Sequence, residues 1–138
     1  MDRIVVDSSV VVKLFLDEEY SNNAYALRDS LISREVRVAV PTIFPYEILN
    51  ALRYSKDYDG EELEQSAESI IGYGFDVFNM NTTFAKNTVK IAKKYDITIY
   101  DASYVALALM IGSKFYTADE KLIADVKLPF VRHIKEFV

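Results

Sequence analysis

The chain has 138 residues, of which 51% are hydrophobic, with a formal net charge of −5 and no cysteine. This length and composition suit a single globular domain spanning residues 1–138, and the lack of cysteine excludes disulfide bonds and thiolate metal sites. The negative net charge argues against a protein that coats nucleic acid without specificity, but it allows a carboxylate site whose charge metal ions neutralise.

No unbroken apolar run approaches the roughly 20 residues that a membrane-spanning helix needs. The first residues, Met1–Asp7, lack the order of a signal peptide, in which a charged segment precedes an apolar one. We therefore expect a cytoplasmic protein that is not inserted in a membrane.

Short β-branched runs predict five strands, and apolar residues at helical spacing predict the helices between them. In chain order, the expected strands cover residues 3–6, 36–40, 75–79, 114–116 and 130–134. The expected helices cover residues 10–16, 21–33, 43–55, 61–71, 82–95, 101–111 and 119–124. Strands that alternate with helices favour an α/β fold with a mostly parallel central sheet and right-handed crossovers.

The helix expected at residues 101–111 is apolar on nearly every side, and its one acidic residue is Asp101. A helix that is hydrophobic all round is normally buried. The chain therefore brings a carboxylate to the edge of its own core.

Three further acidic residues have comparable positions. Asp7 comes directly after the first expected strand, Asp119 follows the fourth, and Glu47 lies at the margin of the apolar face of a helix. Each has a simpler explanation, because aspartate often caps a helix N-terminus and a helical glutamate is usually solvated.

The placement of these acids at strand ends and helix starts favours a common site. The carboxyl ends of parallel strands meet at one edge of the sheet, where ligands bind. Clustered carboxylates are unfavourable without a cation, and an all-oxygen set suits Mg²⁺ or Mn²⁺ better than zinc. Two such ions can hold both oxygens that exchange during phosphodiester cleavage.

The sequence lacks the residues that several other kinds of catalytic site need. The only histidine, His133, is expected in the last strand, away from the acids, as a structural or surface residue. No glycine-rich phosphate-binding loop and no Gly-x-Ser-x-Gly motif is present. A site that activates water through a metal needs no side-chain base, which agrees with this inventory.

Four stretches resemble the PIN-domain ribonucleases, in particular the VapC toxins of VapBC toxin–antitoxin systems. They are Ile4–Ser9, Tyr46–Leu52, Tyr100–Ala108 and Tyr116–Asp119, in the order that the family has. The resemblance implies a three-layer α/β/α sandwich and an Mg²⁺- or Mn²⁺-dependent endoribonuclease that leaves a 5′-phosphate and a 3′-hydroxyl.

By position, the resemblance also assigns the site residues. Catalysis and metal binding would fall to Asp7, Glu47, Asp101 and Asp119, with Ser9 and Thr117 as supporting polar residues. Glu120 is an extra carboxylate that could share the role of Asp119. Family members usually form homodimers that an antitoxin silences, so the implied partners are an RNA substrate, an antitoxin and a second copy of the chain.

A basic stripe on one expected helix could contact RNA or could simply be a solvated face. It consists of Lys86, Lys90, Lys93 and Lys94.

Other functions stay open at this point. A non-catalytic PIN scaffold could bind RNA or a protein, and a PIN nuclease could process RNA or act on DNA. A phosphoryl-transfer enzyme with Asp7 as its nucleophile would usually carry a second aspartate two residues later, where this chain has Ser9. A receiver domain would need an aspartate at the end of a strand in mid-chain, and none is found there.

Overall fold

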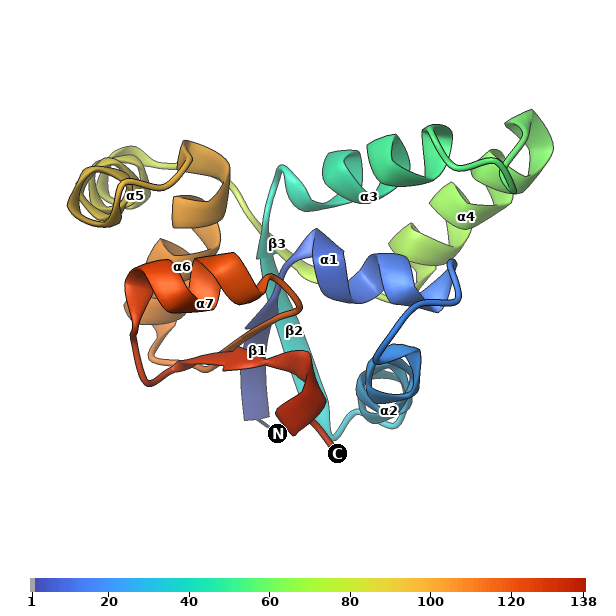
Figure 1. Ribbon diagram of the computed structural model, residues 1–138, viewed down its shortest axis with the longest axis horizontal. Coiled ribbons are helices and arrows are strands. Elements are labelled where there is room, and N and C mark those ends of the chain that lie inside the picture. Colours follow the sequence, from blue (N-terminus) through green and yellow to red (C-terminus); the bar gives the residue numbers. More distant parts are fainter. Residues whose placement is uncertain (1) are drawn as a thin grey trace.

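A five-stranded, all-parallel sheet forms the centre of the molecule (Figure 1). The computed structural model describes residues 2–138. The strands lie in the order β3-β2-β1-β4-β5. They are β1 (Asp2–Val6), β2 (Val36–Pro41), β3 (Asp76–Phe78), β4 (Phe115–Thr117) and β5 (Val131–His133).

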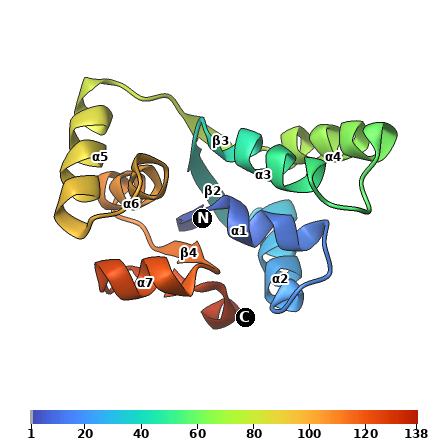
Figure 2. The ribbon, with the colours of Figure 1, turned by 45° about the horizontal axis from the view of Figure 1, so that its top comes forward.

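Helices cover both faces of this sheet, with α1 and α2 on one side and α5 and α6 on the other (Figure 2). The helices are α1 (Ser8–Val11), α2 (Ser21–Ile32), α3 (Phe44–Arg53), α4 (Gly60–Gly72), α5 (Thr82–Tyr95), α6 (Ile99–Ile111) and α7 (Glu120–Val126). The expected α/β/α sandwich is therefore confirmed, and its sheet is entirely parallel.

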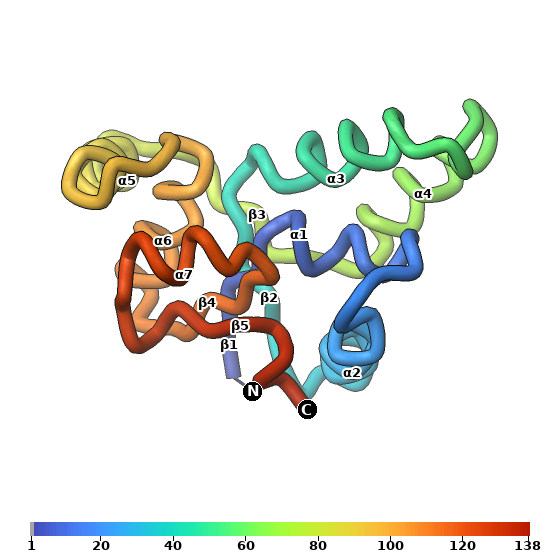
Figure 3. Tube along the Cα trace, in the orientation of Figure 1, coloured from blue at the N-terminus to red at the C-terminus, as the bar shows by residue number. Residues whose placement is uncertain are grey.

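The carboxyl ends of the strands lie at one edge of the sheet. Figure 3 follows the chain from the N-terminus through β1 into α1, and through β2 into α3. Because the strands are parallel, the loops that follow them leave from the same edge of the sheet. The central strands that form this edge are buried on both faces, as residues such as Val5, Val6 and Ala39 show by having no exposed surface.

The helix expected at 10–16 lies two residues earlier in the chain. It begins at Ser8 and passes into a short 3₁₀ turn over Val12–Leu14. The helix expected from Asp101 also begins earlier, at Ile99, because the side chain of Thr98 caps it by accepting the backbone N–H of Asp101 at 3.0 Å.

The burial expected for α6 is correct in the middle of the helix and wrong at its ends. Residues 102–108 are all buried, whereas Tyr100 and Leu109 are 58% and 59% exposed. A helix of 13 residues is about 20 Å long. It packs on β4, β1 and β2, which have three, five and six residues and so span roughly 10–20 Å. Within residues 2–138, no helix is both long enough and apolar enough to cross a bilayer.

Candidate active site

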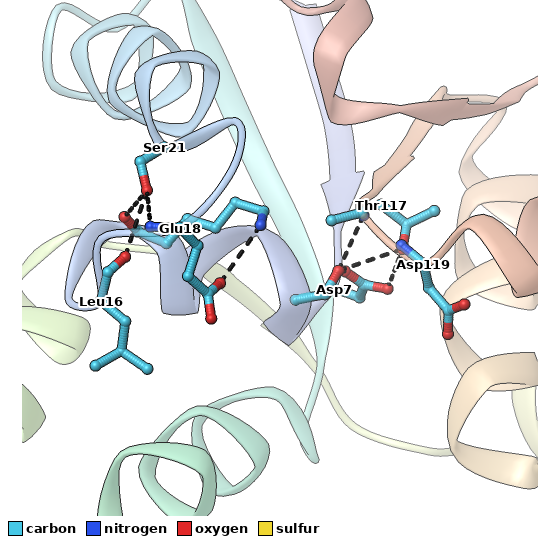
Figure 4. A network of polar contacts seen from close by, with 9 residues as sticks. Asp7, Leu16, Glu18, Ser21, Thr117 and Asp119 are labelled. Carbon is cyan, nitrogen blue, oxygen red and sulfur yellow. Dashed lines mark hydrogen bonds and ion pairs between the residues drawn. The ribbon is translucent and has the colours of Figure 1, made fainter. Parts of the chain in front are cut away.

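Asp7 is the most deeply buried acid of the site, with 7% of its surface exposed. It lies at the start of α1, but its side chain makes no capping hydrogen bond to that helix. Its two carboxylate oxygens instead accept hydrogen bonds from the hydroxyls of Ser9 and Thr117, both at 2.5 Å (Figure 4). Burial raises the pKa of Asp7 to about 7, against an ordinary value of 3.8, although these two hydrogen bonds oppose the shift.

The hydroxyls of Ser9 and Thr117 join the end of β1 to the end of β4. Ser9 accepts the backbone N–H of Ala118 at 3.0 Å, and Thr117 accepts that of Asp119 at 3.1 Å. Thr117 has no exposed surface. The two residues therefore fix the position of the Asp7 carboxylate.

Glu47 reaches the site from the first turn of α3. Its carboxylate accepts a hydrogen bond of 2.5 Å from the hydroxyl of Tyr104, which belongs to α6. Burial raises the pKa of Glu47, the hydrogen bond from Tyr104 opposes this, and the charge of Asp101 adds to it. A glutamate held in this way is not an ordinary solvated helical residue.

Tyr104 also contributes to the site, although the sequence motifs do not single it out. It is 1% exposed, and its ring stacks on that of Phe115 with centroids 5.8 Å apart. Burial and the nearby carboxylate of Glu47 raise the pKa of its hydroxyl, which therefore stays protonated and donates. Its spacing from Asp101, three residues along one helix, was the available signal.

Asp101 lies in the first turn of α6 and is partly exposed. Burial raises the pKa of its carboxyl group, and the charge of Asp119 raises it further. Asp101 in turn raises the pKa values of Asp7 and Glu47. The carboxylates from β1, α3 and α6 thus lie close enough to influence one another's ionisation.

Asp119 differs from the other three acids because its side chain also caps a helix. One of its carboxylate oxygens caps α7 by accepting the backbone N–H of Leu122 at 3.0 Å. Its charge nevertheless reaches Asp101. Capping, the simpler explanation, therefore accounts for one oxygen, while the carboxylate as a whole still borders the site.

Glu120 and His133 form a separate pair beside α7. Glu120 is exposed and lies 3.8 Å from Nε2 of His133, whose ring packs edge-on against Tyr20 at 4.8 Å. The histidine is 5% exposed, and its Nδ1 accepts the backbone N–H of Lys135. This arrangement agrees with a structural histidine and draws Glu120 away from the carboxylate cluster.

The chemistry of the donor set suits Mg²⁺ or Mn²⁺, because it offers only oxygen ligands. Among residues 2–138, no group of three or more acidic or histidine side chains is arranged so that it could hold a metal ion. Burial raises the pKa values of Asp7, Glu47 and Asp101, and no ion pair among the described residues involves these carboxylates. A cation is the partner that such a cluster would favour.

The basic stripe lies on α5, the helix that packs on the outer side of α6 (Figure 1). All four of its lysines are exposed, and no ion pair among the described residues involves them. The structure thus leaves this positive charge on the exposed face of α5. The stripe consists of Lys86, Lys90, Lys93 and Lys94.

Comparison with known sequences assigns the family. The sequence pattern of the PIN domain matches residues 4–127. The chain belongs to the PIN-domain family. This PIN domain contains all four acids and both supporting hydroxyls, so the resemblance seen in the four short stretches is confirmed.

Individual relatives share the fold over most of their length. Ribonuclease VapC3 of Pyrobaculum aerophilum is 29% identical over 125 residues, which are 87% of this PIN domain chain and 92% of the relative. The structure of PAE2754 from Pyrobaculum aerophilum is similar with a TM-score of 0.70 at 20% identity, over 97% of this chain and 85% of the other. A chain of a toxin–antitoxin complex from Klebsiella pneumoniae has a TM-score of 0.67 at 18% identity, over 93% and 94% of the two chains.

Proposed function

We propose that this PIN domain is an Mg²⁺- or Mn²⁺-dependent endoribonuclease and the toxin of a type II toxin–antitoxin system. The observation that carries the proposal is the meeting of Asp7, Glu47 and Asp101. They come from three separate elements, and burial raises the pKa of each; the charge of Asp101 raises those of Asp7 and Glu47 further, and the charge of Asp119 raises that of Asp101. Structural stability gives no reason to collect uncompensated carboxylates, whereas a cation site does.

In this proposal, Asp7, Glu47 and Asp101 hold the metal ions, and Asp119 orients a second ion or the attacking water with the oxygen that does not cap α7. Bound Mg²⁺ or Mn²⁺ would supply charge stabilisation for the phosphodiester and a water of lowered pKa. The contribution of the chain is to keep the ligands in place. Ser9 and Thr117 hold the Asp7 carboxylate, and Tyr104 holds that of Glu47.

The name of Ribonuclease VapC3 supports RNA as the substrate. The toxin–antitoxin complex from Klebsiella pneumoniae has a chain of the same fold, which supports an antitoxin as a partner. A toxin that cuts cellular RNA would act in the cytoplasm, and we also propose the homodimer that the family resemblance implies.

The first test compares wild type with Asp101→Asn and Glu47→Gln on a mixed single-stranded RNA, with Mg²⁺, with Mn²⁺ and with EDTA. Both substitutions keep the shape of the side chain and remove its charge. Asp17→Asn is the matched control, because Asp17 is exposed and lies outside the cluster. Circular dichroism checks that each variant is folded.

We expect metal-dependent cleavage by wild type and Asp17→Asn, and a loss of at least about 100-fold in the two site variants. A folded wild type that binds RNA or a protein partner but cuts nothing with either ion would favour the non-catalytic scaffold. Cleavage of DNA in preference to RNA would favour a PIN nuclease of another kind. Cleavage that survives both site substitutions would contradict the assigned residues.

A further inference from the structure

An apolar pocket lies beyond the carboxyl ends of β2 and β3, between those ends and helices α5 and α6. Its volume is about 150 Å³. The side chains that shape it include Ile43, Phe78, Met80, Phe84, Ile99 and Tyr100. No charged residue lines it, which sets it apart from the acidic site beside it.

The pocket and the acidic site share the same elements. Tyr100 lines the pocket and directly precedes Asp101 on α6. Ile43 lines the pocket from the residue before α3, the helix whose first turn carries Glu47. A ligand bound at one site would therefore lie beside the other.

The strand order gives an approximate distance between the pocket and the acidic site. β2 is the neighbour of β1, which ends one residue before Asp7, and β3 is the next strand along. Neighbouring strands lie about 4.8 Å apart, so the pocket begins roughly 5–10 Å along the sheet edge from the end of β1. An adjacent nucleotide of a single-stranded chain spans such a distance.

The walls of the pocket suit a flat aromatic ring. Phe78, Phe84 and Tyr100 offer ring surfaces, and Met80 offers a polarisable thioether. An apolar cavity of about 150 Å³ accepts a single benzene-sized ring. A phosphate or another charged group would lose its hydration there without gaining a partner.

The surroundings of the pocket indicate where the rest of such a ligand would run. Thr42 lies at the rim, is exposed, and makes no side-chain hydrogen bond to another described residue, so its hydroxyl can meet the polar edge of a base. The lysine stripe lies on the exposed face of α5, away from the buried face that supplies Phe84, so it does not line the pocket.

We propose that this pocket binds one unpaired base of the RNA, next to the phosphodiester that lies at the carboxylates, and that its size favours a pyrimidine. This inference rests on the proposed function, because it names a specificity subsite of that nuclease. Stacking in the pocket would hold the chain in register and so select the bond that is cut.

The test uses the full chain and three proteins: wild type, Met80→Ala and the matched control Met110→Ala. Met80 and Met110 are 48% and 40% exposed, and only Met80 lines the pocket, so the two variants lose the same atoms from similarly exposed positions. Each protein cuts a randomised single-stranded RNA with Mn²⁺, and the cut ends are sequenced. Sedimentation velocity gives the oligomeric state of each protein.

We expect wild type and Met110→Ala to prefer a pyrimidine at one fixed position beside the cut. Met80→Ala should lose about tenfold of this preference, within the range known for stacking of one base on a protein side chain. An unchanged preference in Met80→Ala, or none in wild type, overturns the proposal. A Met80→Ala variant that loses only its self-association would assign the pocket to contact with a second copy, which also overturns it.

A second measurement separates this inference from the proposed function. A short single-stranded RNA containing the fluorescent base pyrrolocytosine is titrated with the same three proteins in Ca²⁺, and stacking is followed as quenching. Binding that is about tenfold weaker for Met80→Ala than for Met110→Ala supports the pocket even if no protein cuts RNA. Equal binding by the two variants contradicts it even if cleavage is normal.

Discussion

Asp7→Asn should stabilise the metal-free protein at alkaline pH while it abolishes metal-dependent activity. Asp7 is 7% exposed, and its pKa in the folded protein is about 7, against an ordinary value of 3.8. The folded state therefore keeps a proton on this carboxyl group that the unfolded state has already lost. As the pH rises from about 4 to 7, the free energy of unfolding falls, and above about 7 the loss is complete.

The size of this effect follows from the two pKa values. They differ by about three, and a pKa difference of one corresponds to about 1.4 kcal/mol, so ionised Asp7 costs about 4 kcal/mol at pH 8. Asparagine has no proton to lose and nearly the same shape. Its amide still accepts one hydroxyl, and the altered second contact costs about 1 kcal/mol. The net gain for Asp7→Asn at pH 8 is about 3 kcal/mol.

The assay is urea denaturation followed by circular dichroism from pH 5 to pH 8.5, at one protein concentration and in EDTA. The difference between wild type and Asp7→Asn should be small near pH 5 and grow towards pH 8. Asp17→Asn, the same change at an exposed position, should follow wild type at every pH. Addition of Mg²⁺ or Mn²⁺ should raise the stability of wild type more than that of Asp7→Asn, because a ligand of the native state stabilises it.

Two results would refute the reasoning about Asp7. Parallel stability curves for wild type and Asp7→Asn would show that the carboxyl group ionises alike in the folded and unfolded states. A variant that is less stable than wild type at pH 8 in EDTA would show that the hydrogen bonds to Ser9 and Thr117 outweigh the burial of the charge.

Three further changes probe the supporting residues. Tyr104→Phe removes the hydrogen bond to Glu47. It should slow RNA cleavage, measured at saturating Mn²⁺, about tenfold. A wild-type rate for this variant would show that the tyrosine only packs. Thr117→Val keeps the side-chain shape but removes a buried hydroxyl that donates to a carboxylate and accepts an N–H. It should lower the urea-derived stability by about 1–3 kcal/mol at pH 8, and an unchanged midpoint would argue against this network. Combined Lys86→Ala and Lys90→Ala should weaken RNA binding and reduce the salt dependence of its affinity by about two charges, whereas an unchanged salt slope would make the stripe a solvated face.

Local sequence patterns were enough to place most of the elements. The β-branched runs before Asp7 and Pro41 form β1 and β2, and the apolar run after Asp101 forms the buried middle of α6. These predictions succeed because the periods of burial in strands and helices are local properties of the chain. The positions of the acids relative to the strand ends follow from the same patterns, since parallel strands share one carboxyl edge.

The environment of each acid depended on contacts between distant parts of the chain. Asp7 is buried and held by Thr117 because β4 lies beside β1, and Glu47 meets Tyr104 because α3 approaches α6. No sequence period encodes these distances. They follow from the order in which the strands pair and from the packing of helices on the sheet.

Asp119 and Glu120 show most clearly the difference between what the local sequence determines and what tertiary contacts decide. In sequence they are adjacent carboxylates, and either could serve the site. In the structure, Asp119 caps α7 and influences Asp101, while Glu120 turns towards His133. The sequence by itself thus determined which residues carry charge at the strand ends. Only the tertiary structure decided which of those charges face one another, because successive residues at a helix start point in different directions and packing selects the one that faces the site.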